Sequence, residues 1–390
     1  MSSGAPVAVR CDPTLLADIR RYGRFDTSGC YQCGSCTISC DLVTDRVSFP
    51  RKTIRHALLG LREPLLGSLD PWICHDCGDC SIICPRQAGP RLSMMTVRRF
   101  LIAQYDWTGI SARILRSKAW YIGALVFVTL LTLALILLYH LWYVELPVAD
   151  FVSIPFGMEH MFPIITYYTC TVLLLPLLLL FSRVGRIWRL TMNRERQPRI
   201  PLSAYVAEAW VYVQQSATHS LMRKCPDRTR WLGHWLLALG TVMMLTIKLV
   251  ALKWFQTDSL YPLYHPQRWL GYLATAFILY GLGSILLGRL RAKKEFYKET
   301  SFADLVFPVL LLLTTLTGIS AHILRYLDFG LACHFMYGVH VMVATPMLLV
   351  EMAFGKWSHM IYRPLALYFE AVKERAERRI PAGEAVAHAT

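Results

Sequence analysis

Cysteine is the residue whose type and spacing carry chemistry most plainly in this sequence. Two runs read C-x2-C-x2-C-x3-C, namely Cys30, Cys33, Cys36 and Cys40, then Cys74, Cys77, Cys80 and Cys84. This spacing is typical of [4Fe–4S] ligands, because cysteines at i, i+3 and i+6 wrap one face of a cubane. The alternatives are a disulfide framework, which a reducing cytoplasm disfavours, and zinc, which usually takes two separated C-x2-C pairs. We therefore predict two [4Fe–4S] clusters.

The fourth cysteine of each run decides how the ligands are shared. In two-cluster ferredoxins this cysteine ligates the other cluster. One cluster is then expected on Cys30, Cys33, Cys36 and Cys84, and the other on Cys74, Cys77, Cys80 and Cys40. The first run is followed by Asp41 and the second by Pro85, so the turn geometry of the first is left open.

The segment between the two runs reads as helix more than strand. Its apolar residues Ile54, Leu58 and Leu61 recur at helical spacing, and Pro50 lies near its start. The cluster domain is thus expected to be of the helical type. His56 and His75 lie among these residues, and we interpret both as surface or hydrogen-bonded histidines.

Composition changes abruptly after Trp120. The chain of 390 residues is 55% hydrophobic and only 17% charged, which is too apolar for an ordinary soluble protein. Each of six apolar stretches is near the ~20 residues that a helix needs to cross the hydrocarbon core. The predicted spans are 119–143, 161–182, 231–252, 269–288, 302–327 and 332–354.

These observations, together with the membrane histidines described below, predict an all-α protein in three parts. Residues 1–110 form a cytoplasmic helical domain with two [4Fe–4S] clusters, residues 111–363 a six-helix transmembrane cytochrome b bundle, and residues 364–390 a cytoplasmic tail. The tail sequence "LALYFEAVKERAERR" is typical of an amphipathic helix, which we expect on the membrane surface.

Positive charge sets the expected topology. The formal net charge is +15, but Lys and Arg gather at the ends of apolar runs, a pattern of membrane topology and not of nucleic-acid binding. The loops after spans 2 and 4 are basic, whereas residues 144–160 contain neither Lys nor Arg. By the positive-inside rule the cluster domain, both basic loops and the tail lie in the cytoplasm. The N-terminus lacks the apolar segment of a cleavable signal peptide.

Histidines within membrane spans need a partner, because a polar ring in lipid is costly. His234 begins span 3, His340 lies within span 6, and His359 lies just beyond it. Nineteen residues separate the last two, or ~28 Å along a helix, so one haem cannot use both. We predict that His234 and His359 share one haem b and that His340 holds a second. The alternative is that these histidines only pack between helices.

Spans 3 to 6 resemble the gamma subunit of respiratory nitrate reductase, a family of dihaem cytochromes b. The resemblance lies in "GHWLLALG", "LLLLTTLTGISAHILRYL" and "KWSHMIYRP". In that family the first ligand helix carries a second histidine ten residues after the first, and here that position is Met244. The candidates for the second ligand of the outer haem are therefore Met244, His322 and His160.

The N-terminal 100 residues resemble the C subunit of heterodisulfide reductase, a small helical protein with two cubane clusters. Its fusion to such a cytochrome is the arrangement of the C subunit of the quinone-interacting membrane-bound oxidoreductase complex. That resemblance implies flavin and iron–sulfur partner subunits, menaquinone or ubiquinone, and electron exchange with dissimilatory adenylylsulfate reductase.

We therefore predict an electron-transfer subunit between membrane quinone and a cytoplasmic partner. Lys248 and Arg268 are the candidate quinone site, because both lie toward the outer face and the nitrate reductase family uses a lysine near the start of the matching helix. Snorkelling of Lys248 and topology anchoring by Arg268 are the alternatives. The alternative functions are a membrane electron acceptor for a tricarballylate-type flavin dehydrogenase and a non-catalytic redox-sensing anchor.

Overall fold

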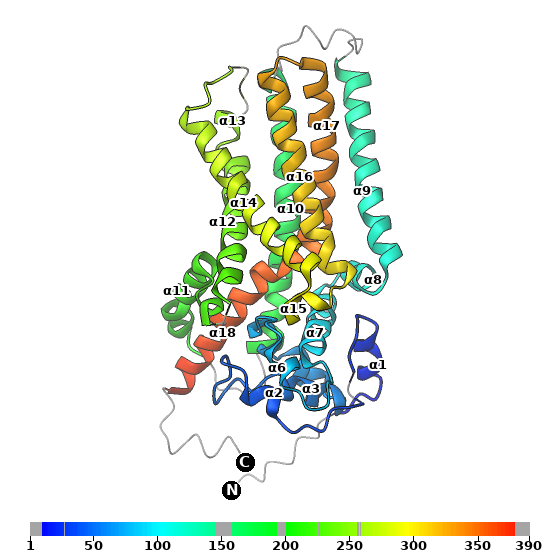
Figure 1. Ribbon diagram of the computed structural model, residues 1–390, viewed down its shortest axis with the longest axis vertical. Coiled ribbons are helices and arrows are strands. Elements are labelled where there is room, and N and C mark those ends of the chain that lie inside the picture. Colours follow the sequence, from blue (N-terminus) through cyan, green and yellow to red (C-terminus); the bar gives the residue numbers. More distant parts are fainter. Residues whose placement is uncertain are drawn as a thin grey trace. The chain divides into compact units, whose positions relative to one another are not determined.

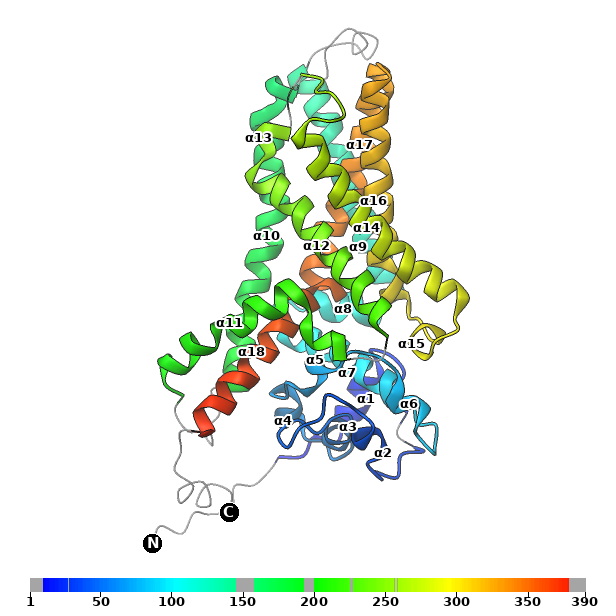
Figure 2. The same cartoon turned by 60° about the vertical axis from the view of Figure 1, so that its left-hand side comes forward.

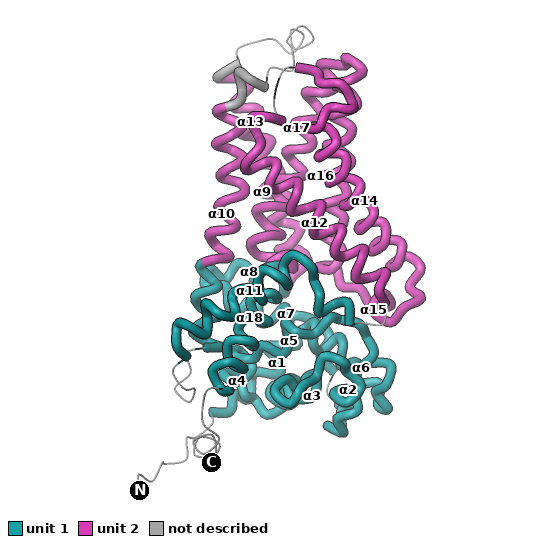
Figure 3. The backbone as a smooth tube through the Cα atoms, turned by 90° about the vertical axis from the view of Figure 1, so that its left-hand side faces the viewer, with its two compact units in different colours: residues 1–116, 182–226, 359–390 teal, residues 117–181, 227–358 magenta. Residues whose placement is uncertain are grey.

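The computed structural model describes residues 10–26, 28–144, 158–192, 200–224, 227–255, 257 and 259–378 (Figure 1). Within these residues every regular element is a helix and no β-strand occurs, which confirms the predicted all-α fold. The chain divides into two compact units (Figure 3). Unit 1 comprises residues 1–116, 182–226 and 359–390, and unit 2 comprises residues 117–181 and 227–358.

Unit 1 is built mostly from short helices around one long buried helix. Its elements are α1 (Leu15–Arg20), α2 (Ser35–Ile38), α3 (Arg51–Leu58), α4 (Arg62–Leu66), α5 (Asp70–Ile73), α6 (Asp79–Ile82), α7 (Pro90–Tyr105), α8 (Ile110–Arg116), α11 (Leu202–Thr218), η3 (Ser220–Lys224) and α18 (His359–Arg378). The end of α10 (Met158–Met192) also belongs to it. The predicted helix between the cysteine runs is present as α3, where Ile54 is buried but Leu58 is exposed.

Helix α18 packs against other helices of unit 1. Its apolar face, which includes Leu365, Phe369 and Val372, is buried, and the helix contacts α11 and α5. Tyr362 packs edge-on against Trp72, with ring centroids 5.3 Å apart. We expected this amphipathic helix on the membrane surface, but its apolar face is already covered by these helices.

Unit 2 contains the long apolar helices. Its elements are α9 (Lys118–Tyr139), η1 (His140–Val144), most of α10, α12 (Arg228–Val250), α13 (Leu252–Phe255), α14 (Pro266–Arg291), α15 (Glu295–Lys298), α16 (Phe302–Tyr326), α17 (Gly330–Pro346), η4 (Met347–Met352) and η5 (Lys356–Ser358). Six helices are long and apolar enough to cross a membrane, as predicted: Lys118–Trp142, Pro163–Met192, Arg228–Val250, Pro266–Arg291, Phe302–Tyr326 and Gly330–Met352.

Glycines allow the closest helix pairing in unit 2, that of α12 with α14 (Figure 2). A Cβ on Gly240 would lie 2.6 Å from the carbonyl oxygen of Ala274, and one on Gly281 would lie 2.5 Å from Cβ of Leu237. Small residues let helix backbones approach in this way, and van der Waals packing holds such pairs in lipid. Helices α16, α17 and α9 form a second packed group.

The helix that carries His340 does not continue to His359. Helix α17 passes into the π-helix η4, the chain bends at Gly355, and α18 begins at His359 after the short η5. The assumption of one straight helix between the two histidines was therefore wrong. The reason is local, since Gly355 fits against the buried Glu351 side chain where no Cβ has room.

Gly281→Ala is expected to lower the free energy of unfolding by ~1–3 kcal/mol, because the new Cβ would overlap Leu237. Gly283→Ala on the same helix is the matched control, because open space surrounds that Cβ position among the described residues. It should be neutral or gain up to ~1 kcal/mol from helix propensity. Thermal unfolding in detergent measures both. Equal losses for the two variants would contradict the close α12–α14 packing.

Candidate iron–sulfur and haem sites

The two cysteine runs adopt the same backbone turn. In each run the residue before the second cysteine has positive φ, 56° at Gln32 and 59° at Asp76. The glycine after that cysteine is also left-handed, with φ of 88° at Gly34 and 99° at Gly78. A one-turn helix follows in both runs, α2 and α6, and these two helices contact each other. Asp41, where the second run has Pro85, therefore does not change the turn that presents the first three cysteines.

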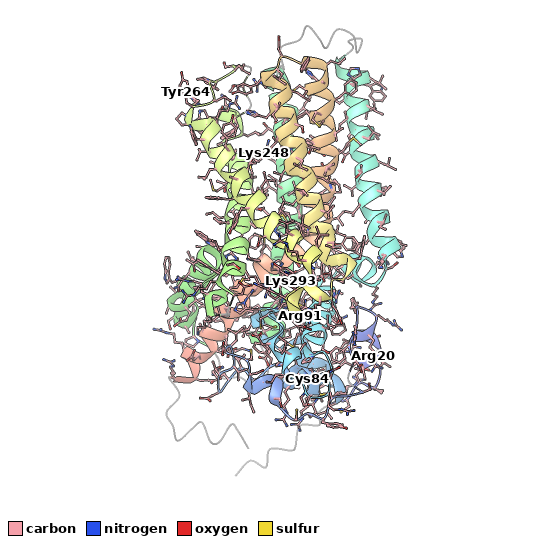
Figure 4. All side chains as sticks on the ribbon, in the orientation of Figure 1. Arg20, Cys84, Arg91, Lys248, Tyr264 and Lys293 are labelled. Atoms are coloured by element: carbon pink, nitrogen blue, oxygen red, sulfur yellow. The ribbon has the colours of Figure 1, made fainter. Side chains whose placement is uncertain are left out.

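The eight cysteines line two cavities, four in each. One, called here the Cys74 cavity, is lined by Cys40, Cys74, Cys77 and Cys80. The other, called here the Cys30 cavity, is lined by Cys30, Cys33, Cys36 and Cys84. Each run thus contributes its fourth cysteine to the cavity of the other, the distribution expected of a two-cluster domain. Figure 4 marks Cys84 and, at the start of α7, Arg91, which lines the Cys74 cavity.

The donor set suits clusters better than single ions. Among the described residues no three His, Cys, Asp or Glu side chains lie close enough together to hold one metal ion. The cysteines instead gather four to a cavity, in two neighbouring cavities. Burial raises the pKa of the Cys40 thiol to about 11 and also raises the pKa of Cys74 and Cys80. These groups are therefore neutral thiols without metal, and iron binding would release their protons.

The surroundings of the Cys74 cavity are more buried and carry charges of both signs, since its lining includes Asp41, Asp76, Asp79, Arg91 and Lys224. Cys74 and Cys80 are buried. Arg98 donates to the backbone carbonyl of Cys74. His75, only 3% exposed, lines the cavity and lies 3.0 Å, Nε2 to Nη2, from Arg363 of α18.

The surroundings of the Cys30 cavity are open. Cys33 is exposed and the other three cysteines are partly buried. Hydrogen bonding from Ser35 lowers the pKa of the Cys33 thiol. The Gln32 side-chain amide donates to Sγ of Cys30 over 3.4 Å. The cysteines of the two cavities therefore differ in exposure although their loops share one conformation.

His340 is held as a metal-binding histidine would be. Its Nδ1 lies 3.0 Å from the carbonyl oxygen of Thr314, which can only accept, so Nδ1 carries the hydrogen. The lone pair is then on Nε2, the arrangement found in metal-ligating histidines whose other nitrogen donates to a carbonyl. A Cβ on Gly318 would lie 3.2 Å from Cε1 of the ring, so that glycine makes room for it.

The other predicted haem ligands occupy separate places. His234 is partly buried on α12, and Met244, on the same helix, packs against the core around Leu282. His322 on α16 is 2.9 Å, through Nε2, from the hydroxyl of Tyr272. His359 begins α18 and belongs to unit 1. The side chain of His160 lies outside the described part of the structure.

The two predicted quinone-site cations lie on neighbouring helices. Lys248, marked on α12 in Figure 4, is near enough to His340 for a charge interaction. Arg268 is 8% exposed, and its Nε and Nη2 have no hydrogen-bond partner among the described residues. The Arg268 guanidinium lies 5.5 Å from the ring centroid of Tyr326. Buried, unpaired guanidinium nitrogens are costly and are expected to meet a ligand.

Sequence reasoning missed two contributors. The hydrogen bond of His75 to Arg363 confirms that it is a hydrogen-bonded histidine, yet its place in the cavity lining was not predicted. Tyr272, the partner of His322, was also missed. Only the position of His75 directly after Cys74 was a signal, since residues between cluster cysteines must line the loop.

Fold and site together define a multi-pass membrane protein with an iron–sulfur domain. Residues 29–88 match the 4Fe-4S dicluster domain family, which supports the predicted clusters. The chain is 38% identical over 102 residues to a protein of Archaeoglobus profundus that is like the C subunit of heterodisulfide reductase, covering 25% of this chain and 53% of that protein.

A second relative points to the same domain. The chain is 42% identical over 69 residues to the C2 subunit of the H(2)/formate:CoB-CoM heterodisulfide,ferredoxin reductase of Methanococcus maripaludis, covering 18% of this chain and 37% of that protein. The chain thus spans about half the length of the first relative and less of the second. No solved structure shows a significant match. The iron–sulfur region is similar to the C subunit of heterodisulfide reductase.

Paired cysteine variants distinguish the shared arrangement from a sequential one. Cys36→Ser with Cys84→Ser removes two ligands of the Cys30 cavity, so about four of about eight cluster irons should remain. Cys36→Ser with Cys40→Ser affects both cavities and should leave neither cluster intact. Iron analysis and electron paramagnetic resonance of anaerobically purified protein measure this, with Cys11→Ser as control. Retention of one full cluster in the second double variant would show that each run binds its own cluster.

Proposed function

We propose that this chain is the membrane electron-transfer subunit of a multi-subunit oxidoreductase. It exchanges electrons between membrane quinone and a cytoplasmic flavin or iron–sulfur partner, and carries two [4Fe–4S] clusters and two haems b. The observation that carries the proposal is that one chain holds two four-cysteine cavities and six apolar helices, one of which presents His340 with the lone pair on Nε2. The similarity of its iron–sulfur region to subunits of heterodisulfide reductases supports membership of a larger complex.

Histidine side chains would hold the haems. His340 offers Nε2 to the outer haem, with Met244, His322 or His160 as the second ligand. His234 and His359 are proposed to share the inner haem. When bound, haems and clusters supply one-electron carriers, and axial ligands together with nearby hydrogen bonds set their potentials. In this proposal the protein contributes the ligands of the cofactors, nearby charges and the exclusion of water.

The quinone site is proposed at the start of α14. Oxidation of a quinol to a quinone releases two electrons and two protons, so the site needs a donor for the carbonyl oxygen and a proton acceptor. Arg268 has unpaired guanidinium nitrogens for the first task. Where Met244 or His160 is the second haem ligand, His322 stays hydrogen-bonded to Tyr272, and these two side chains form a route for the proton. Lys248 lies near enough to His340 for a charge interaction.

The remaining parts of the proposal concern place and partner. The positive loops favour the cytoplasmic membrane, with the iron–sulfur domain and the C-terminus in the cytoplasm. The resemblance of the whole arrangement to the C subunit of the quinone-interacting membrane-bound oxidoreductase complex suggests adenylylsulfate reductase of dissimilatory sulfur metabolism as the final electron partner.

Anaerobic mixing of the purified protein with a menaquinol or ubiquinol analogue tests this function. Quinol should reduce the haem absorption bands, and Arg268→Leu should slow that reduction roughly tenfold to a hundredfold, because a charged hydrogen bond contributes ~1.5–3 kcal/mol. Arg291→Leu, an exposed position on the same helix, is the matched control. Absence of haem bands, or no reduction by either quinol in cluster-replete protein, would refute the proposed function. An unchanged rate in Arg268→Leu and Lys248→Leu would place the quinone elsewhere.

A further inference from the structure

Unit 1 presents its two cluster cavities to different surroundings. The Cys74 cavity is joined to the first turns of α18, and the Cys30 cavity opens to solvent beside exposed apolar side chains. Both observations lie within unit 1. They concern the order in which the two sites are used, which the proposed function leaves open.

The link to α18 runs through two side chains. Arg363 lies one helical turn after His359, ~6 Å along the axis, and contacts His75, the neighbour of Cys74. Burial lowers the pKa of Arg363 only to about 10, so the guanidinium stays charged at neutral pH. The ring of Tyr362 packs edge-on against Trp72, and α18 contacts α5. These contacts hold this turn of α18 against α5, which is followed directly by Cys74.

His75 has a hydrogen left to donate. A guanidinium only donates hydrogen bonds, so Nε2 of His75 accepts and the neutral ring carries its hydrogen on Nδ1. Nδ1 is buried and has no hydrogen-bond partner among the described residues. Because His75 lines the Cys74 cavity, this N–H is suited to a cluster sulfur. Hydrogen bonds to sulfur and nearby positive charge both stabilise the reduced cluster.

The Cys30 cavity has a different border. Four large apolar side chains near the cluster cysteines are exposed, and we call them the apolar rim: Tyr31 70%, Ile38 86%, Ile82 69% and Ile83 52%. Tyr31 lines the Cys30 cavity and Ile83 precedes Cys84, whereas Ile38 and Ile82 each lie two residues from a cysteine of either cavity. Arg86 stacks over Tyr31 at 4.6 Å, and Arg51 also lines the Cys30 cavity. Ile38 and Ile82 lie on α2 and α6, which contact each other. Exposed apolar groups on neighbouring elements favour an interaction surface, and the two arginines, which outnumber the one lining carboxylate, Asp26, favour an acidic partner.

We propose that the Cys74 site receives electrons on the α18 side through Arg363 and His75, and that the apolar rim of the Cys30 site docks the soluble redox partner. The partner is a flavin or iron–sulfur protein with an apolar patch bordered by acidic residues. The proposal rests on the proposed function, which supplies both the two clusters and the soluble partner. One electron at a time would pass between the two sites, with no bond made or broken.

The first arm of the test is a redox titration followed by electron paramagnetic resonance. Arg363→Gln removes a positive charge near the Cys74 site, so the reduction potential of that cluster should fall while the other keeps its value. Arg363→Lys keeps the charge and should restore most of the shift. Arg375→Gln, on the same helix but paired with Glu208, is the control.

Each outcome of the redox titration either supports or contradicts the proposed role of Arg363. Two intact clusters with unchanged potentials in Arg363→Gln would overturn the assignment, as would an equal shift of both clusters. If Arg363→Gln fails to load a cluster, the comparison of Arg363→Lys with wild type decides, because a charge-retaining variant should load both clusters with near wild-type potentials. Wild-type protein that holds no clusters would instead refute the proposed function.

The second arm tests the rim in the native complex. Ile38→Glu and Ile83→Glu should keep both cluster signals but lose the flavin or iron–sulfur partner that copurifies with the wild-type chain, with binding weakened roughly tenfold or more. Leu59→Glu, at an apolar position 50% exposed elsewhere in unit 1, is the matched control and should keep it. If both rim variants keep the partner, the proposed docking surface is wrong. It is also wrong if the variants lose a bound second copy of this chain and keep the redox partner.

Discussion

The exchange of fourth cysteines between the two runs is the constraint on which the iron–sulfur unit depends. Cys40 lines the cavity of the second run and Cys84 that of the first. If each cavity holds one cluster as we predict, the two loops do not bind metal independently, and the contact of α2 with α6 brings them together. Because several of the thiols are buried and neutral without metal, metal loading and folding of this region are coupled.

The iron–sulfur unit is completed by residues from the far end of the chain. Tyr362 packs between Trp72 and Tyr105, and α18 as a whole covers α5 and α11. The segment that matches the dicluster family, residues 29–88, accounts for the cavities but not for these additions. The same C-terminal helix carries His359 and Arg363, so the covering helix also supplies side chains with proposed electron-transfer roles.

Polar groups in unit 2 show how a membrane protein handles groups that lipid cannot solvate. Some are paired within the protein, as Tyr121 donates to the buried Glu351. Others are held so that one atom stays available, as in His340 and Arg268. In an apolar environment an available polar atom is costly unless a ligand meets it. This cost is why we give these two residues functional roles.

The local sequence pattern was enough to predict the features that depend on residues close together in the chain. The cysteine spacing predicted iron–sulfur clusters, and the length of the apolar runs predicted six spans, because cluster ligation and membrane thickness each impose a distance that the sequence repeats. Tertiary structure alone decided which residues meet. His75 contacts Arg363, which lies 288 positions away in the chain. The amphipathic helix α18 packs its apolar face against α11 and α5. The helix after His340 ends at Gly355. Periodicity identifies an apolar face or a polar residue, but its partner is set by packing between distant segments.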